Sequence, residues 1–284
     1  MDPTLPLAIG LLVALKVRPH IRVQGDLAMR LLAALYLVLL VVASPALGAD
    51  PRDPFVTVAQ RNLAGARIAD PPVNTGGRSP VGPQMYRRIV DTVVLVLTQE
   101  AFGSGVIVSP EGHILTNWHV VQGTETVAVV RRSQDLLKGM QAIRREHVYV
   151  ARVLATDVRR DLALIVLTPP PAGLRVAPLG EGGSVEVGQD VYAVGHPKEL
   201  LWSYTEGVVS QIRPQYEWTY REGSTHQATI IQTQTPMHQG SSGGALFDGQ
   251  GRVVGITTAM KDPTLGMAVA VSEVRDWISS LTRR

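Results

Sequence analysis

The sequence predicts an all-β protein. Short runs rich in valine, isoleucine and threonine recur at nearly regular spacing from residue 93 onward, and turn-forming residues separate them. No long helical pattern lies between the runs, so they are typical of an antiparallel barrel or sandwich rather than of a sheet covered by helices. A proline-rich stretch at residues 168–171 (TPPP) divides the runs into two series. The sequence therefore predicts two β units of similar size.

Each predicted strand is short and bounded by turn signals. The first series comprises Val93–Leu97, residues 106–108, His113–Thr116, Thr126–Val130, residues 148–154 and Leu162–Leu167. The second series comprises residues 190–194, 204–212 and 229–233, Ala245–Phe247, Val253–Thr258 and residues 267–271.

Helical patterns are confined to three segments outside these strands. Residues 84–90 fit a short helical turn, and the polar residues 131–146 have the weak helical stripe of a surface insertion. Near the C-terminus, apolar residues follow the i, i+3, i+4, i+7 spacing of an amphipathic helix: Val274, Trp277, Ile278 and Leu281. Residues 272–281 are therefore predicted to form a closing helix.

The N-terminal region has the pattern of an export signal. Residues 31–43 are thirteen consecutive apolar residues, preceded by Met29 and Arg30. A spanning helix needs about 20 apolar residues, so the run fits the shorter core of a signal peptide, with Ala46 and Gly48 at the −3 and −1 positions of a cleavage site. We expect synthesis to start at Met29 and the protein to be secreted or periplasmic. An uncleaved membrane anchor is the alternative.

These patterns divide the chain into four parts. Residues 1–49 form the N-terminal extension and signal peptide, and residues 50–83, rich in Pro, Gly, Asn and Arg, form a flexible linker. Residues 84–172 form the N-terminal β unit. Residues 173–284 form the C-terminal β unit with its closing helix.

Composition excludes several functions. The formal net charge is +3, yet four of the basic residues precede residue 50 and no basic stripe interleaved with aromatic residues follows, so nucleic-acid binding is not expected. The absence of cysteine excludes a disulfide framework, a thiol nucleophile and a cysteine-ligated zinc site. The histidines show no H-E-x-x-H or other metal-ligand spacing, so we expect neither a metal nor a cofactor.

A glycine-rich stretch at residues 240–244 (GSSGG) places Ser242 between glycines, in front of a predicted strand. Glycine-rich backbone bends sharply and lets N–H groups approach a substrate, and a serine beside such donors is what acyl transfer requires. Alone, this pattern is more often a flexible loop. However, His119 follows one predicted strand and Asp161 opens another, so the chain also contains the base and the carboxylate of a serine-hydrolase triad.

The order of these residues restricts the fold that carries them. The G-x-S-x-G pattern around Ser242 also fits an α/β-hydrolase, but that fold places its acid and histidine after the serine, whereas the last histidine here is His238. A subtilisin-like order needs an acid before the histidine. The order His119, Asp161, Ser242 is the one found on paired β-barrels.

Four stretches carry a family resemblance beyond these residues. They are GSGVIV…GHILTNWHVV at residues 103–121, DLAL at 161–164, GHP…EGVVS at 195–210 and QT…GSSGGAL at 232–246. Together they resemble the protease domain of trypsin-like serine proteases of the HtrA (Deg) type, over residues 85–274. The resemblance implies a chymotrypsin-like pair of antiparallel β-barrels with a C-terminal helix and with the site between the barrels.

The resemblance also implies a role for each site residue. Ser242 is the nucleophile, His119 the general base, and Asp161 orients the imidazole and stabilises its cation. The backbone N–H groups of Gly240 and Ser242 form the oxyanion hole. Asp157 is the alternative to Asp161, but its position before the turn is more typical of a capping acid.

Residues around the expected substrate pocket depart from the family pattern. Ser241 replaces the acid against which trypsin inserts its new N-terminus, so no such salt bridge is expected. Gln239 and Ser241 replace the proline and asparagine common in HtrA proteases. A resting conformation in which the oxyanion loop is inactive is therefore an alternative. The pocket residues implied by the resemblance are small or apolar: Pro236, Thr257, Thr258, Ala259 and Met267. They predict cleavage after small to medium aliphatic residues.

The sequence therefore predicts a serine endopeptidase whose partners are unfolded or misfolded polypeptides. The alternative is a protease-fold protein that binds polypeptide with little turnover, with Tyr216, Trp218 and Tyr220 as a candidate surface. The chain ends shortly after the predicted helix, so we expect no PDZ domain of the kind that many HtrA proteases carry. We expect contact with a membrane only through an uncleaved N-terminal segment.

Overall fold

The computed structural model describes residues 53–62, 67–68, 81–133, 145–183, 185–220, 224–258 and 265–281. All of these residues belong to one compact unit, Ala49–Arg284. The predicted signal segment and most of the 131–146 insertion lie outside the described residues. Among the described residues, no helix has both the length and the apolar character needed to cross a membrane.

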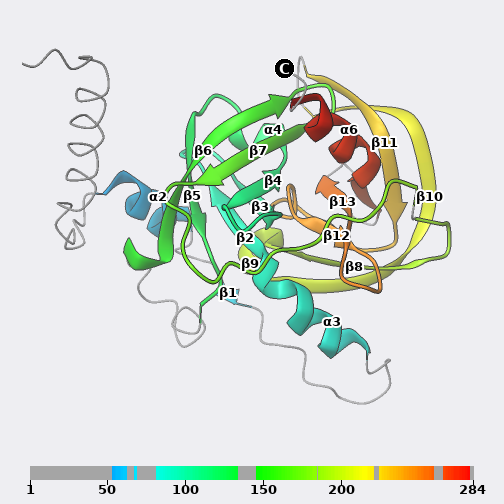
Figure 1. Cartoon of the computed structure of the whole chain (residues 1–284), viewed down its shortest axis with the longest axis horizontal. Coiled ribbons are helices and arrows are strands. Elements are labelled where there is room, and N and C mark those ends of the chain that lie inside the picture. Colours follow the sequence, from blue (N-terminus) through cyan, green and yellow to red (C-terminus); the bar gives the residue numbers. More distant parts are fainter. Residues whose placement is uncertain are drawn as a thin grey trace, which may run out of the picture. The chain divides into compact units, whose positions relative to one another are not determined.

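The first barrel is a closed antiparallel sheet (Figure 1). Its strands are β2 (Val93–Leu97), β3 (Phe102–Ile107), β4 (His113–Thr116), β5 (Thr126–Val130), β6 (Val148–Asp157) and β7 (Leu162–Leu167). Around the barrel they follow the order β2-β3-β4-β7-β6-β5, and β5 pairs back with β2. Thr116 at the end of β4 lies opposite Ala163 near the start of β7. This register brings the residues that follow β4 next to those that precede β7.

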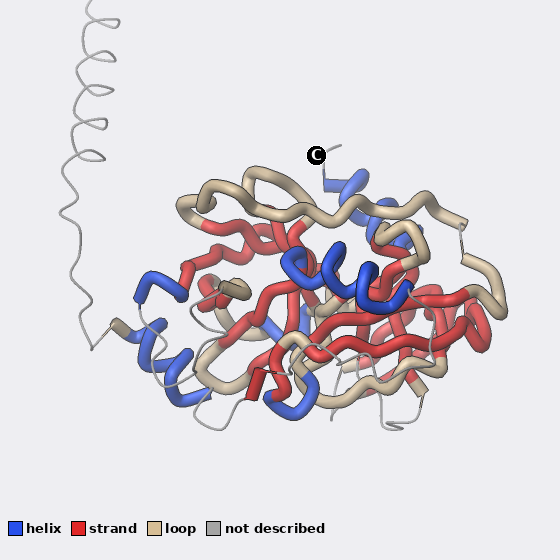
Figure 2. The backbone as a smooth tube through the Cα atoms, turned by 90° about the horizontal axis from the view of Figure 1, so that it is seen from below, coloured by secondary structure: helices blue, strands red, loops and turns tan. Residues whose placement is uncertain are grey.

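The second barrel is also closed and antiparallel. Its strands are β8 (Asp190–Gly195), β10 (Ser203–Thr219), β11 (Thr225–Thr233), β12 (Ala245–Phe247), β13 (Val253–Thr258) and β14 (Gly266–Ala270), in the order β10-β11-β14-β13-β12-β8. The helix α6 (Val271–Leu281), near the end marked C in Figure 2, follows the last strand and buries Val271, Val274 and Trp277. The prediction of an all-β double barrel with a C-terminal helix is confirmed.

Some barrel strands, such as β2, are buried along their whole length. Since successive side chains of a strand point to opposite faces, both faces of such a strand are covered. In β2, Val94 and Val96 belong to an apolar cluster whose members all come from the first barrel and its loops. Val93 and Leu95 belong to a second cluster, which also contains residues of the other barrel such as Phe247. The two barrels therefore share one apolar cluster, and the loops at their junction rest on a packed support.

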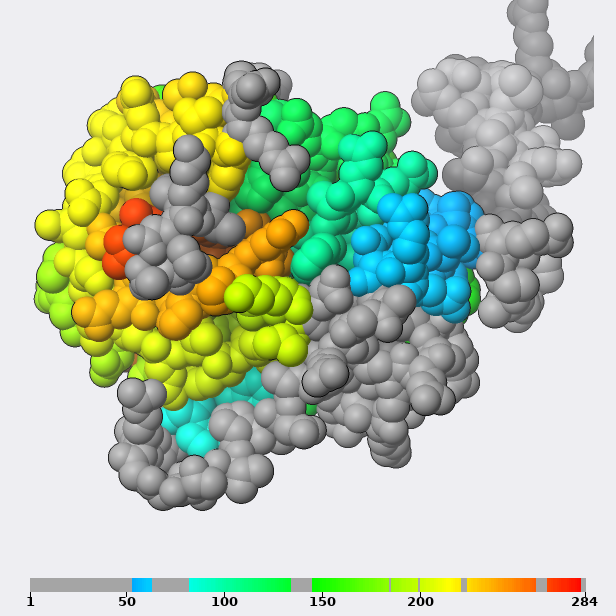
Figure 3. Space-filling view, turned by 180° about the vertical axis from the view of Figure 1, so that it is seen from behind, coloured from blue at the N-terminus to red at the C-terminus, as the bar shows by residue number. Residues whose placement is uncertain are grey.

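Helix α2 (Pro54–Asn62) departs from the expectation of a flexible linker over residues 50–83. Asp53 accepts a hydrogen bond from the Phe55 backbone N–H at 2.9 Å, and a proline occupies the first helical position, as is typical of a helix start. The helix buries Val56 and Ala59, and it contacts β2, β5 and β6 of the first barrel (blue in Figure 3). Its stability comes from this packing, since nine residues are too few for an isolated helix.

Smaller elements complete the described structure. Helix α3 (Val81–Ile89) and the 3₁₀ turn η1 (Val90–Thr92) lead into β2, where the sequence predicts a short helical turn. Three further 3₁₀ or helical turns are α4 (Trp118–Val121), η2 (Arg145–His147) and η3 (Pro197–Glu199). Strand β1 (Arg67–Ile68) pairs in parallel with β9 (Leu200–Leu201).

Candidate active site

His119 and Asp161 come together because β4 and β7 are neighbours. His119 lies on α4, directly after β4, and Asp161 is the residue before β7. The Asp161 carboxylate is fully buried, and it lies 2.8 Å from His119 Nδ1 through Oδ2. Its Oδ1 accepts a hydrogen bond from the His119 backbone N–H at 3.0 Å. Because an ionised carboxylate only accepts hydrogen bonds, Nδ1 carries the proton and His119 Nε2 remains an acceptor.

The backbone of Asp161 is held as firmly as its side chain. Asp161 has a φ of 56°, a left-handed conformation that is uncommon for residues other than glycine. Its carbonyl oxygen accepts hydrogen bonds from Asn117 Nδ2 at 2.9 Å and from the Trp118 backbone N–H at 3.2 Å. The turn before β7 is thus fixed directly to the residues that precede His119.

Two residues of the second barrel complete the surroundings of this pair. Thr258, which the sequence placed in the wall of the substrate pocket, donates from Oγ1 to Asp161 Oδ2 at 3.3 Å. The Tyr220 hydroxyl hydrogen-bonds to Thr258, and the Tyr220 ring lies 4.5 Å from the His119 ring. Burial and the charge of Asp161 raise the pKa of Tyr220 above its usual value, so its hydroxyl stays protonated. Tyr220 therefore supports the histidine as well as its carboxylate.

The loop that carries Asp161 is also tied to the second barrel. Arg160 pairs with Asp157 at 2.7 Å and with Glu273 of α6 at 2.8 Å. Asp157 also accepts from the Arg160 backbone N–H at 3.0 Å, which makes it a turn-capping acid. The Gln227 backbone N–H of β11 donates to the Arg159 carbonyl at 2.7 Å. These contacts hold the turn that precedes Asp161 against both β11 and α6.

Ser242 lies on the loop before β12, between the two barrels. Its carbonyl accepts a hydrogen bond from the Ser104 backbone N–H of β3 at 2.7 Å. Gly243 has a φ of 84°, and a Cβ there would collide with the Ser104 carbonyl and lie 3.1 Å from the Asn117 nitrogen. The residue after Ser242 therefore packs against the backbone just before His119, which requires glycine. The segment that contains Ser242 thus lies beside the segment that leads to His119.

The Gly240 N–H is oriented by its neighbours. The Gln239 carbonyl accepts a hydrogen bond from the Lys198 backbone N–H at 2.9 Å, and in a planar trans peptide the next N–H points the opposite way. Gly240 has a φ of 95°, and a Cβ there would collide with the His196 carbonyl, so glycine is required. Within the described part of the chain, the Gly240 N–H donates to no acceptor.

A second serine–histidine contact lies beneath this loop. Ser104 Oγ is 2.8 Å from His196 Nδ1 and donates to the Gly240 carbonyl at 2.8 Å. His196 is fully buried, and burial lowers its pKa to about 3. None of the contacts of His196 among the described residues is with a carboxylate, and its Nε2 has no hydrogen-bond partner there. This pair lacks the acid and the access that nucleophilic catalysis requires. The sequence contained both residues within its family motifs but gave them no role.

Three of the predicted substrate-pocket residues are neighbours in the structure: Thr257 and Thr258 are consecutive on β13, and Thr258 lies opposite Met267 of β14. Pro236 and Thr257 line a cavity of about 10 Å³ next to Ser241, which is too small for a substrate side chain. The Thr257 hydroxyl is engaged with the Ser241 carbonyl. Met267 is buried on β14, and Ala259 lies outside the described residues. Among the described residues, Ser241 Oγ accepts one long hydrogen bond of 3.4 Å, from the His238 backbone N–H.

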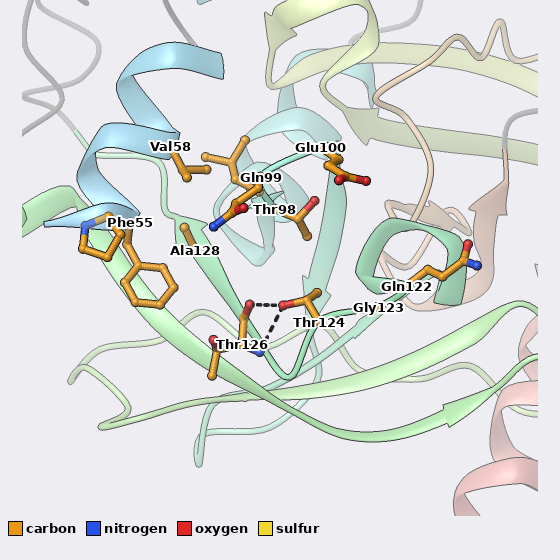
Figure 4. Close-up of a pocket in the computed structure, with 12 residues that line it drawn as sticks. Phe55, Val58, Thr98, Gln99, Glu100, Gln122, Gly123, Thr124, Thr126 and Ala128 are labelled. Atoms are coloured by element: carbon orange, nitrogen blue, oxygen red, sulfur yellow. Dashed lines mark hydrogen bonds between the residues drawn. The ribbon is translucent and has the colours of Figure 1, made fainter.

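A larger cavity, of about 600 Å³, opens on the first barrel (Figure 4). Phe55 and Val58 of α2 form one side of it, and residues of the loops after β2 and α4 form the others. Thr124 Oγ1, in the loop after α4, donates to the Thr126 carbonyl.

No group of three or more His, Asp or Glu side chains suited to a metal ion occurs among the described residues.

The trypsin-like peptidase domain family matches residues 103–256 of the chain. The match includes His119, Asp161 and Ser242 and covers more than half of the chain. The chain therefore belongs to this family of serine peptidases.

Within the family, the chain is of the HtrA or Deg type. It is 30% identical over 197 residues to Protease Do-like 1, chloroplastic, of Arabidopsis thaliana, across 68% of this chain and 42% of the relative. It is 34% identical over 160 residues to a probable periplasmic serine endoprotease DegP-like of Marinomonas sp., across 56% of this chain and 30% of the relative. The solved HtrA-type protease AlgW with tripeptide is 26% identical, with a TM-score of 0.57, across 69% of this chain and 62% of that one. The chain spans less than half the length of the first two relatives.

Proposed function

We propose that the protein is a serine endopeptidase in which Ser242 is the nucleophile, His119 the general base and Asp161 the orienting acid. The observation that carries the proposal is the His119–Asp161 contact of 2.8 Å on a histidine whose side chain is 25% exposed. It leaves His119 Nε2 as the ring nitrogen that can accept a proton. The fully buried His196 offers Ser104 no comparable route to substrate.

The reaction proceeds through an acyl-enzyme. Ser242 Oγ attacks the carbonyl carbon of the peptide bond while its proton passes to His119 Nε2, and the carbonyl oxygen becomes an anion that the N–H groups of Gly240 and Ser242 stabilise. When the C–N bond breaks, the imidazolium donates its proton to the leaving amine. Water then attacks the ester in the same way, and the proton returns to Ser242 as the acid product leaves. Each oxyanion donor contributes about 3–4 kcal/mol to lowering such a barrier.

The proposed substrates are unfolded polypeptides, cleaved after small aliphatic residues. The support for this preference is the small or apolar character of Pro236, Thr257 and Met267 and the absence of acidic character among these predicted pocket residues.

Digestion of reduced casein tests both parts of the proposal. The parent protein should release peptides whose new C-termini, read by mass spectrometry, are mainly Ala and Val. The Ser242→Ala variant should lose at least about 10³-fold in rate, as loss of a triad nucleophile does in other serine proteases. Equal digestion by both proteins would refute the nucleophile, and cleavage mainly after Lys or Arg would refute the preference. Binding of casein without cleavage would instead favour a polypeptide-binding protein.

We also propose a secreted or periplasmic location. The support is the signal-like pattern at residues 31–43 and the word periplasmic in the name of the Marinomonas relative. N-terminal sequencing of the exported protein should find a new terminus after Gly48, whereas an intact N-terminus in the membrane fraction would contradict cleavage.

A further inference from the structure

The carbonyl group of Gly240 is held by a side chain from the other barrel. Ser104 Oγ, on β3, donates to this carbonyl at 2.8 Å, and the Ser104 backbone N–H holds the Ser242 carbonyl at 2.7 Å. One residue of the first barrel therefore contacts the loop on both sides of Ser241. Both Ser104 and Ser242 are almost fully buried, so water does not compete for these bonds.

His196 determines how the Ser104 hydroxyl is oriented. A serine hydroxyl has one proton, and here that proton is donated to Gly240, so the contact of 2.8 Å with His196 requires Nδ1–H as the donor. The His196 ring is fixed by an edge contact with Trp202 at 5.2 Å between ring centres. Trp202 is itself anchored through a hydrogen bond of 3.0 Å from Nε1 to the Val93 carbonyl of β2.

The same short segment also holds the preceding peptide. Lys198, two residues after His196, donates its backbone N–H to the Gln239 carbonyl at 2.9 Å. The carbonyls on both sides of Gly240 are thus fixed, one by Lys198 and one by Ser104. Because a peptide unit is planar, the Lys198 contact with the Gln239 carbonyl sets the direction of the Gly240 N–H in that same peptide. The Ser104 contact fixes the next peptide unit, so Gly240 cannot rotate between the two.

We propose that Ser104 and His196 are positioning residues, which hold the Gly240 N–H in the direction that the substrate's oxyanion requires. The inference rests on the proposed function, since an oxyanion donor is needed only in an acyl transfer. Ser241 has no carboxylate that could form the salt bridge by which trypsin stabilises this loop. The buried side chains of Ser104 and His196 stabilise the loop instead. The loop is accordingly preformed without a cleaved N-terminus.

The rate of peptide hydrolysis per reactive Ser242 distinguishes a positioning role from an effect on folding. End-point titration with a fluorophosphonate counts the competent Ser242 sites, and peptide hydrolysis gives kcat and KM per site. Ser104→Ala should lower kcat by roughly 10- to 100-fold with KM within about twofold, because the lost interaction acts mainly in the transition state. His196→Leu should behave in the same way. His196→Asn, whose amide N–H replaces Nδ1–H, should stay within about threefold of the parent.

Ser109→Ala is the matched control. Ser109 Oγ also hydrogen-bonds to a histidine, His113 Nδ1 at 2.7 Å, in the turn between β3 and β4, so this variant should keep the parent's kcat. The proposal is overturned if Ser104→Ala and His196→Leu keep the parent's kcat per titrated site. This holds even if fewer Ser242 sites react with the fluorophosphonate, since that loss alone would indicate a folding defect. A parent that is not labelled at Ser242 would contradict the proposed function and the positioning role together. A labelled parent with unchanged variants contradicts the positioning role alone.

Discussion

At the scale of single residues, the Asp161 carboxylate is held by donors from both barrels. His119 contributes its backbone N–H and Nδ1 from the first barrel, and Thr258 contributes a hydroxyl from the second. Burying a charge without such donors is costly, and Asp161 Oδ2 accepts from both His119 Nδ1 and the Thr258 hydroxyl. The Thr258 hydroxyl is therefore part of what aligns the acid with the histidine.

Replacing Thr258 by valine removes this hydroxyl while keeping the shape of the side chain. We expect kcat/KM for a peptide substrate to fall roughly 10- to 100-fold, because a hydrogen bond to a charged group contributes about 1.5–3 kcal/mol. Tyr220→Phe is the matched comparison, since it leaves the Thr258–Asp161 contact in place and should cost less. Equal rates for Thr258→Val and the parent would show that Thr258 only packs.

At the scale of elements, the turn before β7 is connected to α6 through charged side chains. Arg160 bridges Asp157 and Glu273, and Glu273 also accepts from the Thr229 backbone N–H of β11 at 2.9 Å. Burial alone would raise the pKa of Glu273, but the hydrogen bonds from Arg160 and Thr229 outweigh it and hold the pKa below the usual value of 4.5. The carboxylate form of Glu273 therefore stabilises the folded protein.

The stability of a Glu273→Gln variant should depend on pH accordingly. A depressed folded-state pKa contributes stability above the unfolded-state pKa, and this contribution is lost as the pH falls through the folded-state pKa. At pH 7 the free energy of unfolding in urea should be about 1–3 kcal/mol lower than in the parent, and the difference should shrink at pH 3. The exposed Glu217→Gln should change it by less than about 0.5 kcal/mol. A difference that is the same at both pH values would contradict this role of Glu273.

Elements without a strong apolar pattern were the ones that sequence reasoning missed. Helix α2 has only Val56 and Ala59 as buried residues, so no periodicity marks it, although Asp53 followed by Pro54 was a usable start signal. Strand β10 extends to Thr219 rather than ending at residue 212, because a bulge with Gln215 at a φ of 53° carries it past Pro214. In the sequence, Pro214 suggested the end of the strand. In the structure, the strand continues past Pro214 with an irregular hydrogen-bonding register.

At the scale of the whole molecule, the fold was predictable because both faces of many strands are buried. Continuous apolar runs such as Val93–Leu97 give strands whose bounds the structure matches. The roles of Ser104, His196 and Thr258 were not predictable, because they arise where strands of different barrels meet. Chain order indicated which residues are the candidate triad, whereas the hydrogen bonds around them depend on tertiary packing that no local pattern encodes.

The central claim is that Ser242, and not Ser104, is the activated serine of this chain. Mass spectrometry of the full-length protein after reaction with a fluorophosphonate locates the modified residue directly. We predict one adduct, on the peptide that contains Ser242, and no adduct after His119→Ala. An adduct on Ser104, or labelling at Ser242 that persists unchanged without His119, would contradict the account.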